Sequence, residues 1–182
     1  MARLPYPDPA AMPDEVRETL DALPARLNVF RMMAHAEANV RPLVALGSSI
    51  LLRQRLDARL RELAILRVAR LSQAEYEWVQ HVPIAKAVGT SDAEVAALER
   101  GDVADACFDV RTRAVLDFVT DVVENVRASD DRLRALRAHL DEREVVELLL
   151  AVGYYMMIAR LLETTGVDLE PPLESSIIDV HR

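Results

Sequence analysis

The chain has 182 residues, of which 51% are hydrophobic and 29% charged, and its formal net charge is −8. This length and apolar content favour one domain with a packed core and exclude a disordered chain. The acidic balance argues against a general binder of nucleic acid or of anionic membranes. Only 5 glycines and 4% aromatic residues are present, which disfavours glycine-rich phosphate loops and turn-dense β folds. We therefore expect an all-α protein.

Helices can be placed in chain order from capping residues and from the spacing of apolar positions. The predicted helices cover Pro13–Leu23, Leu27–Asn39, Pro42–Leu52, Asp57–Leu71, Gln73–Val88, 92–100, Asp109–Arg127, Asp130–His139 and Asp141–Thr165. Ser72 and Ser91 each precede a glutamate by three residues, which is the pattern of a capping box. Gly89 and Gly166 are predicted to end the helices before them.

The whole chain, residues 1–182, is expected to be a single domain, with residues 1–13 as an extended arm and residues 167–182 as an irregular tail. The arm contains four prolines and no apolar segment, so we do not expect a signal peptide. Cys107 is the only cysteine, which excludes an internal disulfide and indicates a reducing, cytoplasmic compartment.

The last predicted helix is apolar on almost every side. Its longest uncharged run, Leu148–Ala159, is shorter than the about 20 residues that cross a bilayer, so we expect no membrane partner. A helix without a polar face must lie in the core or against another subunit. The sequence therefore predicts a homo-oligomer.

Glu62 is the first candidate for chemistry, because its helical neighbours include the apolar residues Ala58, Ile65, Leu66 and Ala69. A carboxylate in such a place must be paired or protonated. One interpretation is a structural ion pair with Arg59 or another arginine, and the other is a catalytic acid.

Glu77 and His81 are the second candidate, four residues apart on an otherwise apolar helical stripe. A carboxyl group and an imidazole together can move a proton near neutral pH. The alternative interpretation is an ordinary helical side-chain contact without a function.

A helix beginning at Gln73 would direct free N–H groups toward an anion. Arg67 and Arg70 come just before it and could bind a substrate carboxylate, although surface arginines are the simpler interpretation. The sequence contains no Walker loop, dinucleotide fingerprint or HExxH zinc motif. We expect no cofactor.

Three segments together resemble the carboxymuconolactone decarboxylase family of the alkylhydroperoxidase D-like superfamily. They are Arg61–Arg70 (RELAILRVAR), Tyr76–Trp78 (YEW) and His81. The resemblance implies an all-α, alkylhydroperoxidase D-like helical bundle that forms homo-oligomers, commonly trimers or dimers of trimers.

The peroxidase branch of this family carries a glutamate, a CxxC pair and a histidine. The resemblance places the glutamate on Glu62, the two cysteines on Ala74 and Glu77, and the histidine on His81. Both sulfurs are absent, and thiol–disulfide chemistry requires a thiolate. We therefore expect no peroxidase activity by that route.

The decarboxylase branch, which also lacks the pair, implies a cofactor-free lyase acting on a small lactone or unsaturated carboxylate. On this hypothesis His81 transfers the proton, Glu77 orients or re-protonates it, and Glu62 is a relay or second acid. Four further residues are assigned to substrate binding, namely Arg67, Arg70, Tyr76 and Trp78.

Three alternatives stay open. Glu62, Glu77 and His81 could supply three metal ligands. The chain could be a helical oligomer that has lost thiol redox activity and only binds a ligand or a partner. Redox chemistry could also survive through Cys107.

Overall fold

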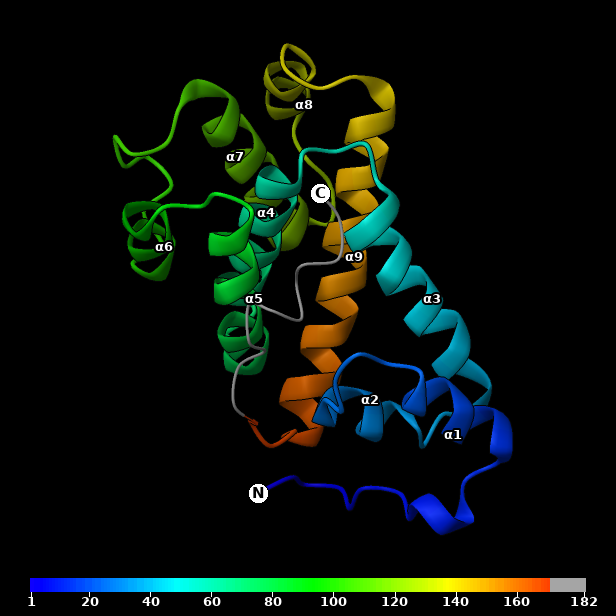
Figure 1. Cartoon of the computed structure of the whole chain (residues 1–182). Helices are drawn as coiled ribbons and strands as arrows, with labels where there is room; N and C mark the ends of the chain where they lie inside the picture. The colour runs from blue at the N-terminus through cyan, green and yellow to red at the C-terminus, as the bar shows by residue number, and fades with distance from the viewer. Residues whose placement is uncertain (171–182) are drawn as a thin grey trace.

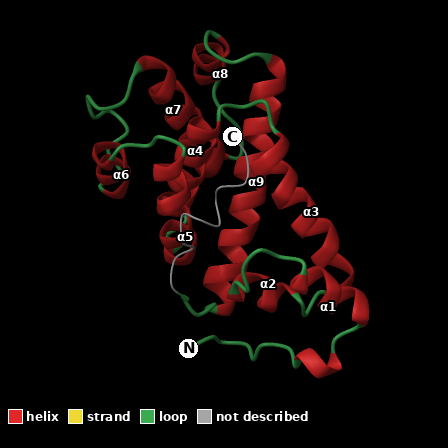
Figure 2. Ribbon diagram, viewed as in Figure 1, coloured by secondary structure: helices red, strands yellow, loops and turns green. Residues whose placement is uncertain are grey.

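The computed structural model describes residues 1–170, and every regular element in that part of the chain is helical (Figure 2). A short 3-10 helix covers Pro9–Ala11. The α-helices are α1 (Asp14–Asp21), α2 (Asn28–Met33), α3 (Glu37–Arg53), α4 (Ala58–Leu71), α5 (Glu75–Ala87), α6 (Asp92–Glu99), α7 (Val110–Asn125), α8 (Asp130–Arg137) and α9 (Glu142–Thr165). The all-α prediction is confirmed.

Helix α4 is the centre of the molecule. It contacts α5, α6, α7 and α9, which surround it in Figure 1. Every residue from Leu60 to Ala69 is buried, including Glu62. The Asp57 carboxylate caps the helix by accepting a hydrogen bond from the Leu60 amide at 3.0 Å. A polar residue between Leu60 and Ala69 is therefore placed in the core whatever side of the helix it occupies.

The predicted capping box at Ser72 is wrong. Helix α5 begins at Glu75, its N-cap residue is Ala74, and no side chain caps it. Ser72 instead ends α4, because its amide bonds to carbonyls of that helix. The anion site expected at Gln73 therefore does not exist in the predicted form.

A Schellman motif explains this difference. Gln73 adopts a left-handed φ of 55°, the conformation that the residue after a helix commonly takes. The Ala74 amide donates to the Ala69 carbonyl at 2.9 Å, and the Gln73 amide donates to the Arg70 carbonyl at 3.3 Å. These bonds satisfy the end of α4 and reverse the chain into α5 within three residues.

The second and third predicted helices also differ from the structure. The segment expected as Leu27–Asn39 divides into α2 and the start of α3, and α3 passes through Pro42 instead of beginning there. Val40 and Ile50 are buried on either side of this proline. Tertiary packing thus outweighs the bond that Pro42 cannot make. The other helices agree closely with their predicted ranges.

Helix α9 begins and ends within one residue of its predicted range. Asp141 and Glu144 form a capping box, and Gly166 ends the helix with a φ of 61°. By length and composition alone α9 could cross a membrane, yet half of its most apolar window is buried. It packs against α3, α4, α7 and α8. These contacts are those of a core helix, and a core helix can be as long and as apolar as one that crosses a membrane.

Helices α3 and α9 lie side by side (Figure 1). The Tyr154 hydroxyl donates to the Leu43 carbonyl at 3.1 Å. A Cβ atom on Gly47 would stand 2.6 Å from the Tyr154 oxygen, so the tyrosine occupies space that only a glycine leaves. At the other end of this seam, the Glu147 carboxylate accepts the Leu56 amide at 2.8 Å.

The N-terminal segment crosses the end of α9. The Arg3 amide donates to the Thr165 carbonyl at 2.7 Å, and the Tyr6 hydroxyl accepts the Asp168 amide at 3.0 Å. The predicted irregular tail begins at Val167, and its part beyond Glu170 lies outside the described residues.

Candidate functional site

The centre of the site is a direct contact between Glu62 of α4 and His81 of α5. His81 Nδ1 lies 2.8 Å from Glu62 Oε2. Glu62 is fully buried, and His81 is 8% exposed. The two helices run next to each other because of the short turn between them, so two residues 19 apart in sequence share a hydrogen bond.

The second oxygen of Glu62 is also satisfied. Arg61 Nε donates to Glu62 Oε1 at 3.2 Å, and Arg61 is itself 5% exposed. Arg59, the partner that the sequence suggested first, pairs instead with Glu94. Glu62 thus has the structural ion pair and the histidine contact at once, so the two interpretations of this residue are compatible.

The tautomer of His81 follows from its partner. A carboxylate beside an arginine accepts hydrogen bonds and donates none. We therefore assign the hydrogen to Nδ1, which donates to Glu62. This leaves Nε2 as the nitrogen able to take a proton from another molecule.

Glu77 is buried without a hydrogen bond. It is 2% exposed, and neither carboxyl oxygen has a partner among residues 1–170. Burial raises the pKa of Glu77 well above its ordinary value, and the nearby Glu163 carboxylate raises it further. Burial without a donor therefore favours the protonated form of Glu77.

The structure buries all three residues proposed as catalytic but does not connect them all. Glu77 makes no hydrogen bond to His81 or to Glu62. The hypothesis that Glu77 orients His81 is therefore corrected: Glu62 makes that contact. Within residues 1–170, no three His, Cys, Asp or Glu side chains gather closely enough to hold a metal, which disfavours the three-ligand alternative.

The two arginines proposed for substrate binding do not meet this pair. Arg67 is buried, and its guanidinium donates to Thr120 Oγ1 at 3.0 Å and to the Gly101 carbonyl at 3.4 Å. Arg70 is exposed at the end of α4. Arg67 thus ties α4 to α7 and to the loop after α6, and a substrate role for either residue stays a prediction.

The two aromatic residues proposed for substrate binding take part in packing. The Tyr76 hydroxyl accepts the Val29 amide at 3.3 Å and donates to Glu170. Trp78 is half-buried against a small apolar cluster that includes Leu63. Both contacts join elements of the fold, so neither side chain is free to move without disturbing it.

Cys107 is a free, half-buried thiol. Burial raises its pKa to about 11, and the neighbouring Asp105 carboxylate adds to the shift. The thiol is therefore protonated near pH 7 and is a poor nucleophile. This opposes the alternative in which redox chemistry survives through Cys107.

Two site residues were missed in the sequence. Arg61 belongs to the quoted motif, but its place next to Glu62 in the sequence does not predict that the two side chains form a hydrogen bond. Tyr155 of α9 packs its ring edge against His81. Its position in an apolar run is typical of any core aromatic residue, so no sequence signal separates it from its neighbours.

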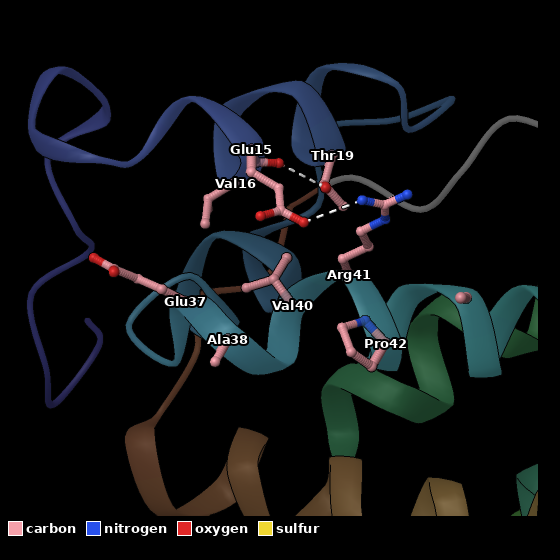
Figure 3. A pocket seen from close by; sticks show the side chains of 9 residues that line it. Glu15, Val16, Thr19, Glu37, Ala38, Val40, Arg41 and Pro42 are labelled. Atoms are coloured by element: carbon pink, nitrogen blue, oxygen red, sulfur yellow. Dashed lines mark hydrogen bonds and ion pairs between the residues drawn. The ribbon is translucent and has the colours of Figure 1, made fainter.

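A surface hollow of about 360 Å³ lies elsewhere, between α1 and the start of α3 (Figure 3). Arg41 and Glu15 form an ion pair of 3.1 Å across it, and both side chains are exposed. None of the candidate catalytic residues lines this hollow.

Comparison with solved structures defines the fold class as alkylhydroperoxidase D-like. The chain is similar to an AhpD-core, uncharacterized peroxidase-related protein from Ralstonia eutropha JMP134, with 22% identity, a TM-score of 0.80 and coverage of 97% of this chain and 95% of that one. An uncharacterized peroxidase-related protein from Silicibacter sp. TM1040 gives 19% identity, a TM-score of 0.78 and coverage of 92% and 91%. A protein of unknown function from Agrobacterium tumefaciens gives 23% identity and a TM-score of 0.65, with coverage of 77% of this chain and 97% of that one.

Residues 38–121 match the carboxymuconolactone decarboxylase family, and they contain both Glu62 and His81. The fold is therefore AhpD-like, and the part of the chain that carries the motif is similar to the carboxymuconolactone decarboxylase family. The single cysteine means that the chain lacks the CxxC pair. No curated protein matches the sequence significantly.

Proposed function

We propose that this protein is a cofactor-free lyase that transfers a proton to a small lactone or an unsaturated carboxylate. The observation that carries the proposal is the buried hydrogen bond between His81 Nδ1 and Glu62 Oε2, 2.8 Å long. A carboxylate on one ring nitrogen fixes the tautomer and supports the ring when the other nitrogen gains a proton. His81 Nε2 is therefore the proton-transfer atom.

The proposed reaction removes CO₂ from a lactone that carries a carboxylate. The bond from the ring carbon to the carboxylate breaks, and its electron pair moves into the unsaturated lactone as a dienolate. His81, protonated at Nε2, then delivers that proton to a carbon of the dienolate and regains one from water. A buried site favours both steps, because charge is stabilised most where solvent is excluded.

Glu77 supplies the second acid in this proposal. As a neutral buried carboxyl without a partner among the described residues, it can donate a hydrogen bond to a substrate oxygen on which negative charge develops. It lies one helical turn before His81, nearer the start of α5. Glu62 and Glu77 then have different roles: Glu62 supports the protonated imidazole of His81, and Glu77 stabilises the negative charge that develops on the substrate.

The proposal is tested by incubating the purified protein with a γ-lactone carboxylate and measuring CO₂ release. His81→Ala and Glu62→Gln are expected to lower kcat by about 100-fold or more, the usual contribution of a general acid. Glu99→Gln, on an exposed residue of α6, is the control. Full activity in both site variants would overturn the proposal.

We also propose that the protein self-associates through the outer face of α9. Four large apolar side chains with helical spacing are exposed there: Val146 (55%), Leu149 (39%), Leu150 (51%) and Met157 (40%). Large exposed apolar side chains on one face of a helix are typical of an interface. A second copy of the chain is the partner proposed.

Sedimentation equilibrium tests the association. Leu149→Glu combined with Leu150→Glu is expected to weaken it at least 100-fold, because two charges would be buried against apolar groups. Val110→Glu is the matched control, since Val110 is 65% exposed at the start of α7. A monomeric wild-type protein, or a double variant that associates as the wild type does, would contradict the proposal.

A further inference from the structure

Tyr155 is the aromatic neighbour of the histidine. Its ring centroid lies 4.7 Å from that of His81, and the two ring planes meet at 86°. Tyr155 is 5% exposed and projects from α9. Edge-to-face packing is one of the arrangements that aromatic rings prefer. The contact brings a third helix to the Glu62–His81 pair.

Tyr155 also lies in the field of both carboxyl groups. Burial raises the pKa of its hydroxyl well above the ordinary value, and Glu62 and Glu77 each raise it further. Tyr155 thus touches His81 directly and lies close enough to Glu62 and Glu77 for their charges to act on its hydroxyl.

The position of Tyr155 is fixed by its own surroundings. Its ring contacts that of Tyr154 at 5.4 Å and 78°. Tyr154, also on α9, is in turn fixed against α3 by its hydrogen bond to the Leu43 carbonyl and by its close packing on Gly47. The Tyr155 ring is thus supported, through Tyr154, by helix α3.

We propose that Tyr155 is the positioning residue for His81. A single hydrogen bond at Nδ1 fixes one edge of an imidazole but lets the ring rock about that bond. A perpendicular ring in contact with the imidazole blocks this motion and keeps Nδ1 on Glu62 and Nε2 presented to substrate. The catalytic meaning of this rests on the proposed function, whereas the positioning itself does not.

The test measures how quickly the His81 Nδ1–H exchanges with water, by NMR of the ¹⁵N-labelled protein. Tyr155→Leu removes the ring and is expected to speed exchange at least tenfold. Tyr155→Phe keeps the ring and is expected to change it less than twofold. Tyr76→Phe is the control, because it removes a buried tyrosine hydroxyl from the same helix as His81 without touching the imidazole.

Exchange within twofold of wild type in a folded Tyr155→Leu protein would overturn the proposal, and so would equal acceleration in the Leu and Phe variants. If Tyr155→Leu does not fold, the wild type decides: a nuclear Overhauser effect between the rings of His81 and Tyr155 supports the contact, and its absence refutes it. Full lyase activity in His81→Ala, with the expected exchange results, would reject the proposed function and leave the positioning role intact.

Discussion

Two buried carboxyl groups on neighbouring helices have opposite surroundings. Glu62 on α4 is fully buried and accepts a donor on each oxygen, from Arg61 and from His81. Glu77 on α5 is 2% exposed and has no hydrogen-bond donor among residues 1–170. The sequence gives both residues the same apolar neighbourhood.

The difference shows that donors, and not burial alone, decide what a carboxyl group does in a core. A carboxyl group with an arginine and an imidazole beside it has its hydrogen bonds made within the core, whereas burial without donors favours the protonated form. In a single site, these two states give a group that supports a cation and a group that donates a hydrogen bond.

The largest effect is expected from Glu62→Leu. This change leaves Arg61 and His81 buried without their acceptor, and removing one member of a buried ion pair costs about 3–5 kcal/mol. Urea unfolding at pH 7 measures the loss. Glu99→Leu, an exposed site without a partner in the hydrogen-bond and ion-pair geometry of the described residues, should change the free energy of unfolding by less than about 0.5 kcal/mol. Equal losses in the two variants would end the distinction between paired and unpaired carboxyls.

A smaller loss is expected from Arg61→Met, which removes one donor from Glu62 and keeps the other. A hydrogen bond to a charged group contributes about 1.5–3 kcal/mol, and the methionine side chain retains much of the apolar stem. The same urea experiment checks this value. A variant as stable as the wild type would mean that His81 alone satisfies Glu62.

Glu77→Gln is expected to change the pH dependence of stability. The pKa of Glu77 is raised in the folded state, so the folded protein binds more protons than the unfolded chain. Stability contributed by this proton is complete below the ordinary value of 4.5 and is lost as the pH rises toward the folded-state value.

The limit of that loss is about 1.4 kcal/mol per pH unit. Glutamine does not titrate, so the stability of Glu77→Gln relative to wild type should increase from pH 5 to pH 8. Thermal unfolding across this range measures the difference. Parallel pH profiles would show that Glu77 is ionised in the folded protein and has found a donor.

The smallest effect is expected from Glu163→Gln. The charge of Glu163 is the second cause of the raised pKa of Glu77, but Glu163 is exposed and therefore screened by solvent and salt. Stability at pH 8 should rise by less than about 0.5 kcal/mol, and the gain should disappear in the Glu77→Gln background. A double-mutant cycle at low and high salt measures the coupling.

Much of the fold follows from local chemistry that can be read in the sequence. The boxes at Ser91 and Asp141 and the left-handed glycines Gly89 and Gly166 end or begin helices where predicted. The prediction failed where two local signals compete, as at Ser72, or where packing decides, as at Pro42. Local signals do not say which of two satisfied arrangements the rest of the chain will favour.

The candidate site could be predicted as a set of residues but not as a set of contacts. The burial of Glu62, Glu77 and His81 follows from the apolar stripes on which they lie. The partner of each does not, because helix spacing fixes neighbours within one helix and leaves open the register between helices. Tyr155 comes from a third helix, and only the packed fold brings it to His81.

The missing side chain at Gly47 reaches further than its own helix. Any larger residue there would displace Tyr154. The ring of Tyr154 packs against that of Tyr155, and the ring of Tyr155 packs against His81. An alanine on α3 could thus disturb an imidazole that it never touches. Redesign of this scaffold for a new reaction should therefore treat Gly47 as a residue that influences the site. A library that randomises Gly47 would sample altered imidazole geometries without changing any residue of the quoted motif.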